Sequence, residues 1–308
     1  MATVERTLRP AAVARRRLDL VGTGFRVLLA VSLLVSLGLL TVLLVDVFSS
    51  GMGTLTERGS DFLTSNLSRR PARAGVWQGI KGSLMLAAIV AVVAFPLGVA
   101  TAIYLEEYAR PGRLTRFIDL NIRNLAGVPS IVYGILGFGI FVRTLGGITG
   151  GRSVVSGGLT LAVLVLPIVI ITSAEALRAV PDSLRHAGFG VGATRWEVVR
   201  SLVLPSAAPG ILTGTILALA RALGETAPLI LVGAFFGTYF STPSASLLEQ
   251  LRGDYTALPM IVFQWATDSQ AELKNQLAPA AILVLLAITV SANLVAVLLR
   301  NRYERRTR

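Results

Sequence analysis

Long uncharged runs of apolar residues alternate with short arginine-rich segments along most of the chain. A helix needs roughly 20 apolar residues, each rising 1.5 Å, to cross a hydrocarbon core about 30 Å thick. Five separate runs are long enough, and a sixth helix fits within a longer run in the second half. The predicted membrane spans cover residues 27–45, 82–105, 124–142, 153–174, about 209–236 and 275–299.

The run from residue 201 to residue 248 is the hardest to divide, because only Arg221 and Glu225 interrupt its 48 residues. It could form one kinked helix with an amphipathic outer segment, or two spans. With six spans in total, 19 basic residues fall on the side of both termini and nine on the other side. Because cytoplasmic loops carry an excess of lysine and arginine, we expect six spans and two cytoplasmic termini.

Composition supports the membrane assignment. The 308 residues are 53% hydrophobic and 15% charged, with a mean hydropathy of +0.69. The 30 glycines and 13 prolines are compatible with membrane helices, which tolerate both residues better than soluble helices do. A net charge of +12 would suggest nucleic-acid binding in a soluble protein, but here the arginines flank apolar runs and no nucleic-acid partner is expected. The predicted class is an all-α polytopic membrane protein.

Little enzymatic chemistry is available. The chain has no cysteine and one histidine, which excludes disulfides and cysteine nucleophiles and argues against a histidine-built metal centre or catalytic triad. No GxxxxGK[ST] segment is present, so the chain cannot hydrolyse ATP with a phosphate-binding P-loop. Glu106 and Glu107 follow the second span and should be solvated or paired with Arg110. We therefore expect no catalytic residue, metal or cofactor.

Arg221 is the most informative single residue, because a charge inside a membrane helix costs at least ~2.5 to 3.5 kcal/mol and commonly marks an ion pathway. Its planar fork of donors matches the oxygens of phosphate better than a lysine does. Glu225 lies four residues on, on the same helix face, and Thr226 offers a hydroxyl nearby. Arg221, Glu225 and Thr226 are therefore candidates for the substrate pathway; alternatively, Arg221 and Glu225 form a permanent ion pair that specifies helix packing.

The segment 182–204 lies between the fourth and fifth spans, on the predicted cytoplasmic side. Asp182 is expected to cap a short helix, the glycines at 188, 190 and 192 permit a tight turn, and a second short helix is expected around Trp196. From periodicity alone this could be an amphipathic connector that lies on lipid headgroups.

The spacing within this segment resembles the EAA motif of ABC-importer permeases. That motif is a Glu-Ala-Ala trio, a glycine four residues beyond its last alanine, and an apolar-x-Leu-Pro ending. Here the trio is His186, Ala187 and Gly188, the glycine is Gly192, and residues 202–205 form the ending. The resemblance implies a coupling helix that docks in a cleft of a cytoplasmic ATPase, with Asp182, His186, Ala187, Gly188 and Gly192 as coupling residues. His186 stands where the motif has its glutamate.

Two further segments resemble phosphate-specific permeases of this importer family. Residues 124–134 read NLAGVPSIVYG, and residues 221–229 read RALGETAPL. Ala227 and Pro228 after Gly-Glu-Thr resemble the A-type (PstA-like) subunit, since the C-type subunit usually has a methionine-containing stretch there. The first segment supplies candidate helix-interface residues, namely Gly127, Pro129, Ser130 and Tyr133.

The resemblance implies the fold of an ABC importer type I permease with six transmembrane helices and a coupling helix between helices 4 and 5. The expected organisation is a tail, first helix and external loop (1–79), a permease domain (80–302) and a basic cytoplasmic tail (303–308). The implied function is ATP-driven phosphate import across the cytoplasmic (inner) membrane.

The implied partners are a C-type permease in a heterodimer, two cytoplasmic ATPase subunits, an extracytoplasmic phosphate-binding protein and membrane lipid. Two alternatives stay open. The same fold could carry another oxyanion, sulfate or molybdate, because an arginine fork serves these equally. An ion-gradient-driven secondary transporter would also contain broken helices and buried charges, but it usually shows internal repeats, and none is evident here.

Overall fold

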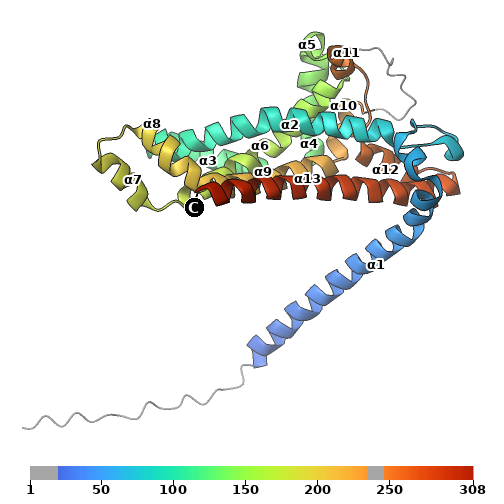
Figure 1. Cartoon of the computed structure of the whole chain (residues 1–308), viewed down its shortest axis with the longest axis horizontal. Coiled ribbons are helices and arrows are strands. Elements are labelled where there is room, and N and C mark those ends of the chain that lie inside the picture. Colours follow the sequence, from blue (N-terminus) through green and yellow to red (C-terminus); the bar gives the residue numbers. More distant parts are fainter. Residues whose placement is uncertain (1–19, 235–245, 308) are drawn as a thin grey trace, which may run out of the picture. The chain divides into compact units, whose positions relative to one another are not determined.

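The computed structural model describes residues 20–234 and 246–307, and it divides into two compact units, residues 1–46 and 47–308. The described residues contain helices and no strand (Figure 1). Helix α1 (Leu20–Thr64) contains the described part of the first unit and the start of the second. Its apolar part includes the predicted first span. Gly59 interrupts the helix with φ 47°, a left-handed conformation that other residues adopt only with strain.

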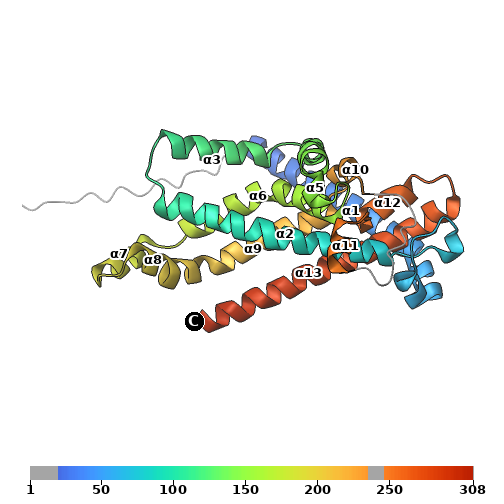
Figure 2. The same ribbon diagram turned by 90° about the horizontal axis from the view of Figure 1, so that it is seen from above.

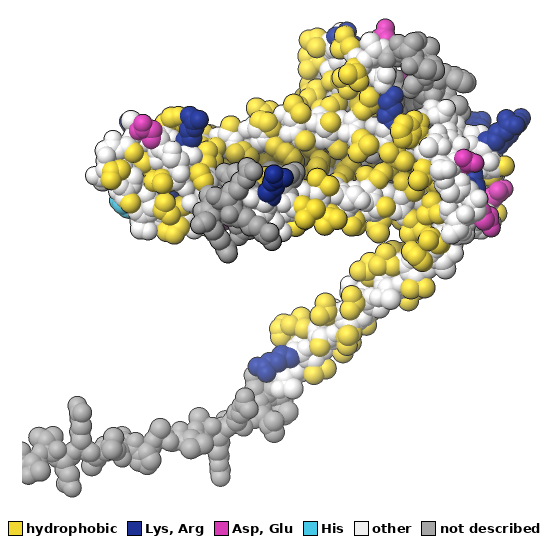
Figure 3. Space-filling view, viewed as in Figure 1, with side chains coloured by type: hydrophobic (Ala, Val, Ile, Leu, Met, Phe, Trp, Pro, Cys, Tyr) yellow, Lys and Arg dark blue, Asp and Glu magenta, His cyan; other side chains and the backbone are white. Residues whose placement is uncertain are grey.

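Four long helices form the body of the second unit. Helices α2 (Trp77–Ile103), α6 (Val154–Arg178), α9 (Leu204–Gly224) and α13 (Ala278–Thr307) run side by side in both views (Figures 1 and 2). Helix α6 packs against both α2 and α9, and α13 packs against α9. Hydrophobic side chains cover the length of this bundle (Figure 3). The arrangement confirms the predicted spans 82–105, 153–174 and 275–299.

Small residues bring these helices together. Gly98 of α2 lies against Val169 of α6, and Gly214 of α9 lies against Thr172. Lipid tails are as apolar as leucine side chains, so membrane helices associate through such close backbone approaches rather than through the hydrophobic effect. Helix α6 is accordingly the most buried of the four and forms the centre of the bundle.

The third predicted span, residues 124–142, is wrong as a single straight helix. Helix α3 (Arg113–Ala126) ends before Gly127, and α4 (Ser130–Gly137) continues as a π-helical segment, η3 (Phe138–Thr144), at an angle of 102° to α3. Pro129 causes the break, because proline has no backbone N–H and keeps the preceding residue out of the helical conformation. The described residues therefore contain five helices long enough to cross a membrane, or six if this bent pair is one span.

The fifth predicted span, about 209–236, is also different in the structure. The helix begins earlier, with α8 (Arg195–Val198) and a π-helical turn, η4 (Val199–Val203), continuous with α9. It ends at Gly224, where Glu225 is extended and a separate short helix, α10 (Ala227–Val232), begins. Pro228 favours a new helix start, because the first turn of a helix needs no N–H from it. Residues 235 and 236 lie outside the described residues.

Short elements connect the long helices at both ends of the bundle. At one end lie η1 (Pro71–Arg73), α12 (Leu258–Ala266) and the π-helical turn η5 (Leu273–Leu277). Helices α5 (Gly146–Thr149) and α11 (Leu247–Arg252) lie next to each other and stand out from the side of the bundle (Figure 1). At the other end lie α7 (Asp182–Gly190), α8 and the π-helical turn η2 (Tyr104–Tyr108) that extends α2 (Figure 1). We call this second end the loop end.

Candidate translocation and coupling sites

Arg221 lies in the last turn of α9, yet at the depth of the centre of the neighbouring helix. Gly210 of α9 lies against Ala176 of α6 and Gly214 lies against Thr172, so each four-residue step along α9 matches a four-residue step back along α6. Seven residues beyond Gly214, Arg221 is level with about Val165, near the middle of the uncharged stretch 153–174. In agreement, Ala222 and Leu161 line the same small cavity.

The ion pair at this position engages little of the guanidinium group. Nε of Arg221 donates to Oε1 of Glu225 at 3.2 Å, and the Arg221 side chain is about half exposed. Neither terminal amino group of Arg221 has a hydrogen-bond partner among the residues that the structure describes. Beside the pair, a Cβ on Gly224 would meet nothing within 4 Å. The two amino groups are therefore accessible to an anion.

Thr226 follows this pair at the start of α10, and its side chain makes no capping hydrogen bond. The hydroxyl of Thr215, one and a half turns before Arg221, is instead buried and donates to the carbonyl of Leu212 at 2.8 Å. Of the two threonines, Thr226 has the hydroxyl that could reach a ligand.

The two segments that resemble phosphate permeases meet in the fold, although some 90 residues of sequence separate them. Helix α4 packs along α10, and the Cα of Pro228 is the nearest atom to the position of a Cβ on Gly134. The buried Tyr133 donates its hydroxyl to the carbonyl of Leu125 at 2.8 Å and so bridges the bend between α3 and α4. The first segment therefore positions the loop that carries Glu225.

The candidate helix-interface residues have different places. Tyr133 is buried, whereas Gly127, Pro129 and Ser130 form the bend itself. The close contacts come from Gly134 against α10 and Gly137 against Thr160 of α6, two small residues of the predicted third span. Small residues in an apolar span are typical of such close helix approaches.

The predicted coupling segment folds as two short helices with a sharp turn. Helix α7 ends at Gly190, Gly192 has φ +85°, and a capping box between Thr194 and Glu197 starts α8. Pro181 occupies the N-cap position of α7, so Asp182 lies in the first turn and does not cap the helix. The segment is thus a compact helix-turn-helix at the loop end of the bundle (Figure 1).

The surface of this helix-turn-helix combines an anchored side and an exposed apolar side. Gly188 is buried, with Val198 and Leu202 nearest to the position of its missing Cβ. His186 and Ala187 are exposed, and Nδ1 of His186 lies 2.9 Å from the carbonyl oxygen of Asp182. Three large apolar side chains on this segment are also exposed, Phe189, Val191 (85%) and Trp196.

Comparison with known proteins identifies the family. The family described as binding-protein-dependent transport system inner membrane component matches residues 94–308. The chain belongs to this family. The phosphate transport system permease protein PstA 1 of Mycobacterium tuberculosis is 35% identical over 304 residues, with 97% of this chain and 93% of that protein covered. PstA of Yersinia pestis is 36% identical over 73% of this chain and 72% of its own.

Solved ABC importers share the fold of this permease. A bacterial alginate ABC transporter in complex with its alginate-bound periplasmic protein aligns with a TM-score of 0.62 at 14% identity, covering 90% of this chain and 93% of that one. The MetNI methionine ABC transporter aligns with a TM-score of 0.53 at 20% identity, covering 77% of this chain and 99% of that one. The permease is therefore an all-α membrane protein with the ABC importer fold.

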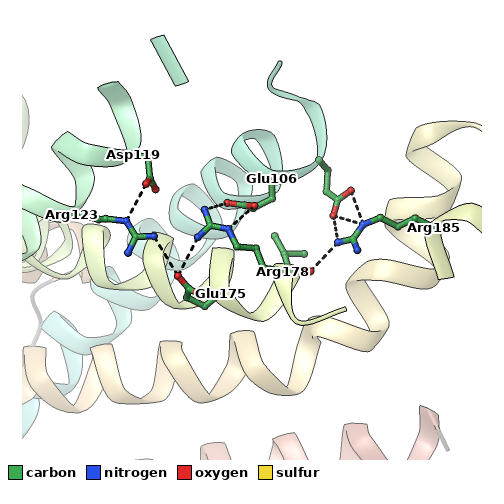
Figure 4. Close-up of polar contacts among 8 residues, drawn as sticks. Glu106, Asp119, Arg123, Glu175, Arg178 and Arg185 are labelled. Carbon is green, nitrogen blue, oxygen red and sulfur yellow. Dashed lines mark hydrogen bonds and ion pairs between the residues drawn. The ribbon is translucent and has the colours of Figure 1, made fainter. Parts of the chain in front are cut away.

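An ion pair connects the helix-turn-helix of the permease to the end of α2 (Figure 4). Arg185 of α7 donates to the carboxylate of Glu107 at 2.8 Å, and Glu107 is only 8% exposed. The same guanidinium donates to the carbonyl oxygens of Leu177 and Val180, at the end of α6. The hydrogen bond to Glu107 raises the pKa of Arg185 above its ordinary value. Arg185 therefore links α7 to both α2 and α6.

A second set of ion pairs joins α2, α3 and α6 at the loop end (Figure 4). Arg178 of α6 holds Glu106 at 2.5 Å and Glu175 at 3.2 Å. Arg123 of α3 bonds to Glu175 at 3.4 Å and to Asp119 at 3.1 Å. These contacts show that the expected solvation of the two glutamates, or their pairing with Arg110, is wrong. Their partners lie 72 and 78 residues away in sequence, so only the packing of α6 and α7 against α2 reveals them.

We found no metal-binding cluster in the described ranges, since no three His, Asp or Glu side chains there come together in a suitable way.

We predict that Glu107→Gln loosens α7, because it removes the charge that Arg185 pairs with in a poorly hydrated position. The expected loss of stability is about 1–3 kcal/mol, less than for a fully buried pair, since Arg185 keeps its two carbonyl partners. Thermal unfolding of the purified permease in detergent measures it, and limited proteolysis of residues 182–204 locates it. Asp182→Asn is the control, because Asp182 also pairs with Arg185 but is mostly exposed. Equal effects of the two substitutions would contradict the prediction.

Proposed function

We propose that this permease subunit carries inorganic phosphate across the inner membrane, driven by ATP that a separate ATPase subunit hydrolyses. The similarity to two phosphate transport system permeases over most of the chain supports phosphate as the substrate. The observation that carries the proposal is Arg221, which presents two unpaired amino groups at the depth of the centre of α6.

The proposed pathway residues form a site suited to transient anion binding. Guanidinium binds phosphate oxygens with two parallel charge-assisted hydrogen bonds. Glu225 already accepts the hydrogen bond from Nε of Arg221, so an entering anion would bind to the two remaining amino groups. The negative charge of Glu225 would repel the anion and so lower its affinity. Thr226 adds a hydroxyl at the same break in the helix. Binding that is favourable but not tight suits a residue that must also release its ligand.

We assign the loop end to the cytoplasm, because both termini and the helix-turn-helix then carry the excess of basic residues. There, the exposed Phe189, Val191 and Trp196 form an apolar surface that can enter the cleft of an ATPase. Movement of the ATPase would pass through the Arg185–Glu107 pair to α2 and α6 as rigid-body movement of the helices.

The proposed assembly is the one that the family resemblance implies. A C-type permease completes a heterodimer, two ATPase subunits bind at the loop end, and a phosphate-binding protein delivers substrate at the opposite end. His186 is exposed on the surface of α7 that would meet the ATPase, where the related motif has a glutamate. A neutral or cationic side chain at this position requires a different polar partner on the ATPase than a carboxylate does.

The proposal is tested by uptake of labelled phosphate into proteoliposomes that contain the complete co-purified complex, with ATP at the loop-end face. We expect uptake that requires both ATP and the external binding protein, and no uptake of labelled sulfate. Uptake of sulfate or molybdate in preference to phosphate would assign the same fold to another oxyanion. Uptake driven by an ion gradient without ATP would overturn the proposal.

In the same assay we predict that Arg221→Ala abolishes phosphate uptake while the complex still assembles. Arg221→Lys should lower uptake about tenfold to a hundredfold, because lysine keeps the charge but loses the paired hydrogen bonds. Arg26→Ala, an exposed arginine on α1 that takes no part in the proposed pathway, is the control and should transport normally. If Arg221→Ala instead prevents assembly, Arg221 and Glu225 are a packing pair rather than a transport site.

We further predict that Gly192→Leu and Trp196→Ser uncouple the permease from its ATPase without unfolding it. A side chain at φ +85° costs about 1–2 kcal/mol and distorts the turn, whereas Trp196→Ser removes an exposed apolar contact. Co-purification of the ATPase and ATP-dependent uptake should both fall. Leu247→Ser, at an exposed apolar residue on α11, controls for loss of surface hydrophobicity. If both variants bind the ATPase as the unchanged protein does, residues 182–204 only connect two helices and do not dock the ATPase.

A further inference from the structure

A cavity of about 730 Å³ opens at the loop end between the π-helical turn η2 and helix α3, away from Arg221. Nothing in the proposed transport cycle uses this cavity. The hydroxyl of Thr115 donates to the carbonyl of Arg110 at 2.9 Å and holds the turn between the two elements. The lining residues are Leu105, Glu106, Ala109, Pro111, Gly112, Arg113, Thr115, Arg116, Asp119 and Arg178.

The cavity carries uncompensated positive charge. Its two carboxylates are already neutralised, since Glu106 pairs with Arg178 and Asp119 pairs with Arg123. Arg113 and Arg116 lie one turn apart on α3, and neither makes an ion pair with any residue that the structure describes. Two free guanidinium groups beside an open cavity are a site for an anion with several acceptor oxygens.

An apolar strip runs along α3 directly beside these arginines. Leu114 (72%), Phe117 (63%) and Leu120 recur every three residues and are largely exposed. The arginine side and the apolar side of α3 thus lie next to each other over about two helical turns. A small inorganic anion would use the arginines and leave this strip uncovered, whereas a phospholipid would use both.

The cavity lies at the ends of the membrane-spanning helices, the level at which lipid headgroups are expected. Arg178 stands in the last turn of α6, and Glu106 and Ala109 lie at the end of the span formed by α2 and η2. From this level, α3 leads back along α6 toward the middle of the bundle (Figure 2). A lipid whose phosphate reaches Arg113 and Arg116 would therefore lay an acyl chain along Leu114, Phe117 and Leu120.

We propose that this cavity binds the headgroup of an anionic phospholipid from the leaflet at the loop end. Arg113 and Arg116 hold the phosphodiester, and the apolar strip of α3 holds an acyl chain. Basic pockets at the cytoplasmic ends of membrane helices are suited to anionic headgroups. Because Glu106 and Arg178 form one wall, a bound lipid adjoins the ion pairs that join α2, α3 and α6.

Native mass spectrometry of the purified full chain in detergent tests the proposal, with phosphatidylglycerol as the anionic probe and phosphatidylcholine of the same acyl chains as the neutral one. We expect phosphatidylglycerol to bind preferentially. Arg113→Gln with Arg116→Gln should weaken its binding about thirtyfold. Arg69→Gln with Arg70→Gln, two exposed arginines at the opposite end, is the matched control and should bind as the unchanged protein does.

Two further experiments distinguish a lipid headgroup from free inorganic phosphate as the ligand. Phe117→Ser should weaken phosphatidylglycerol binding without altering the arginines, which would support an acyl-chain contact. Millimolar inorganic phosphate should leave the bound lipid in place. Displacement of the lipid by inorganic phosphate would overturn the proposal in favour of a phosphate site, and unchanged lipid binding by the double arginine variant would overturn it outright. A thermal unfolding midpoint equal to that of the unchanged protein shows that each variant is folded.

Discussion

A charge and unpaired backbone groups are costly within a hydrocarbon layer, and the end of α9 at Gly224 places both at the depth of the centre of α6. Such a break is tolerated only where protein or a polar path surrounds it. Helix α10 and the bend at Pro129 supply the surrounding backbone, and Glu225 supplies a counter-charge for Arg221. The bend between α3 and α4 and the packing of α4 on α10 therefore help the bundle to accommodate Arg221 and the break in α9.

The close packing of α6 makes this arrangement possible. Glycines let side chains of α6 pack directly against the backbones of α2 and α9, so the three helices are packed together rather than separate. The same unit extends to the loop end, where Arg178 and Arg185 connect α6 and α7 to the two glutamates that end α2. The helix-turn-helix at the loop end and the charged break near the centre are therefore attached to the same packed helices, as the proposed coupling between them requires.

Charged groups have different roles at different depths of this permease. Near the centre, the proposed transport site has a single arginine whose two amino groups have no hydrogen-bond partner among the described residues. At the loop end, carboxylates and arginines are matched and connect helices, because water and headgroups there lower the cost of burying them. Arg113 and Arg116 depart from this matching, and they do so beside an open cavity and an apolar strip. Because these two arginines have no ion-pair partner among the described residues, they can bind a ligand, whereas the paired arginines connect helices.

The sequence by itself determined the membrane class, most of the spans and the helix-turn-helix around Gly192, and it singled out Arg221 as a candidate pathway residue. These features are local in the sequence: the length of an apolar run, a glycine in a turn and a lone charge in an apolar run. Each has a known free-energy effect in a membrane protein, whatever its neighbours in the fold. The tertiary structure decided where helices break, that residues 124–134 and 221–229 meet, and which partners Glu106 and Glu107 have. It also set the depth of Arg221, at the end of its own helix but level with the middle of α6. These features depend on contacts between residues far apart in sequence, and a hydropathy pattern records the length of each helix but not its neighbours.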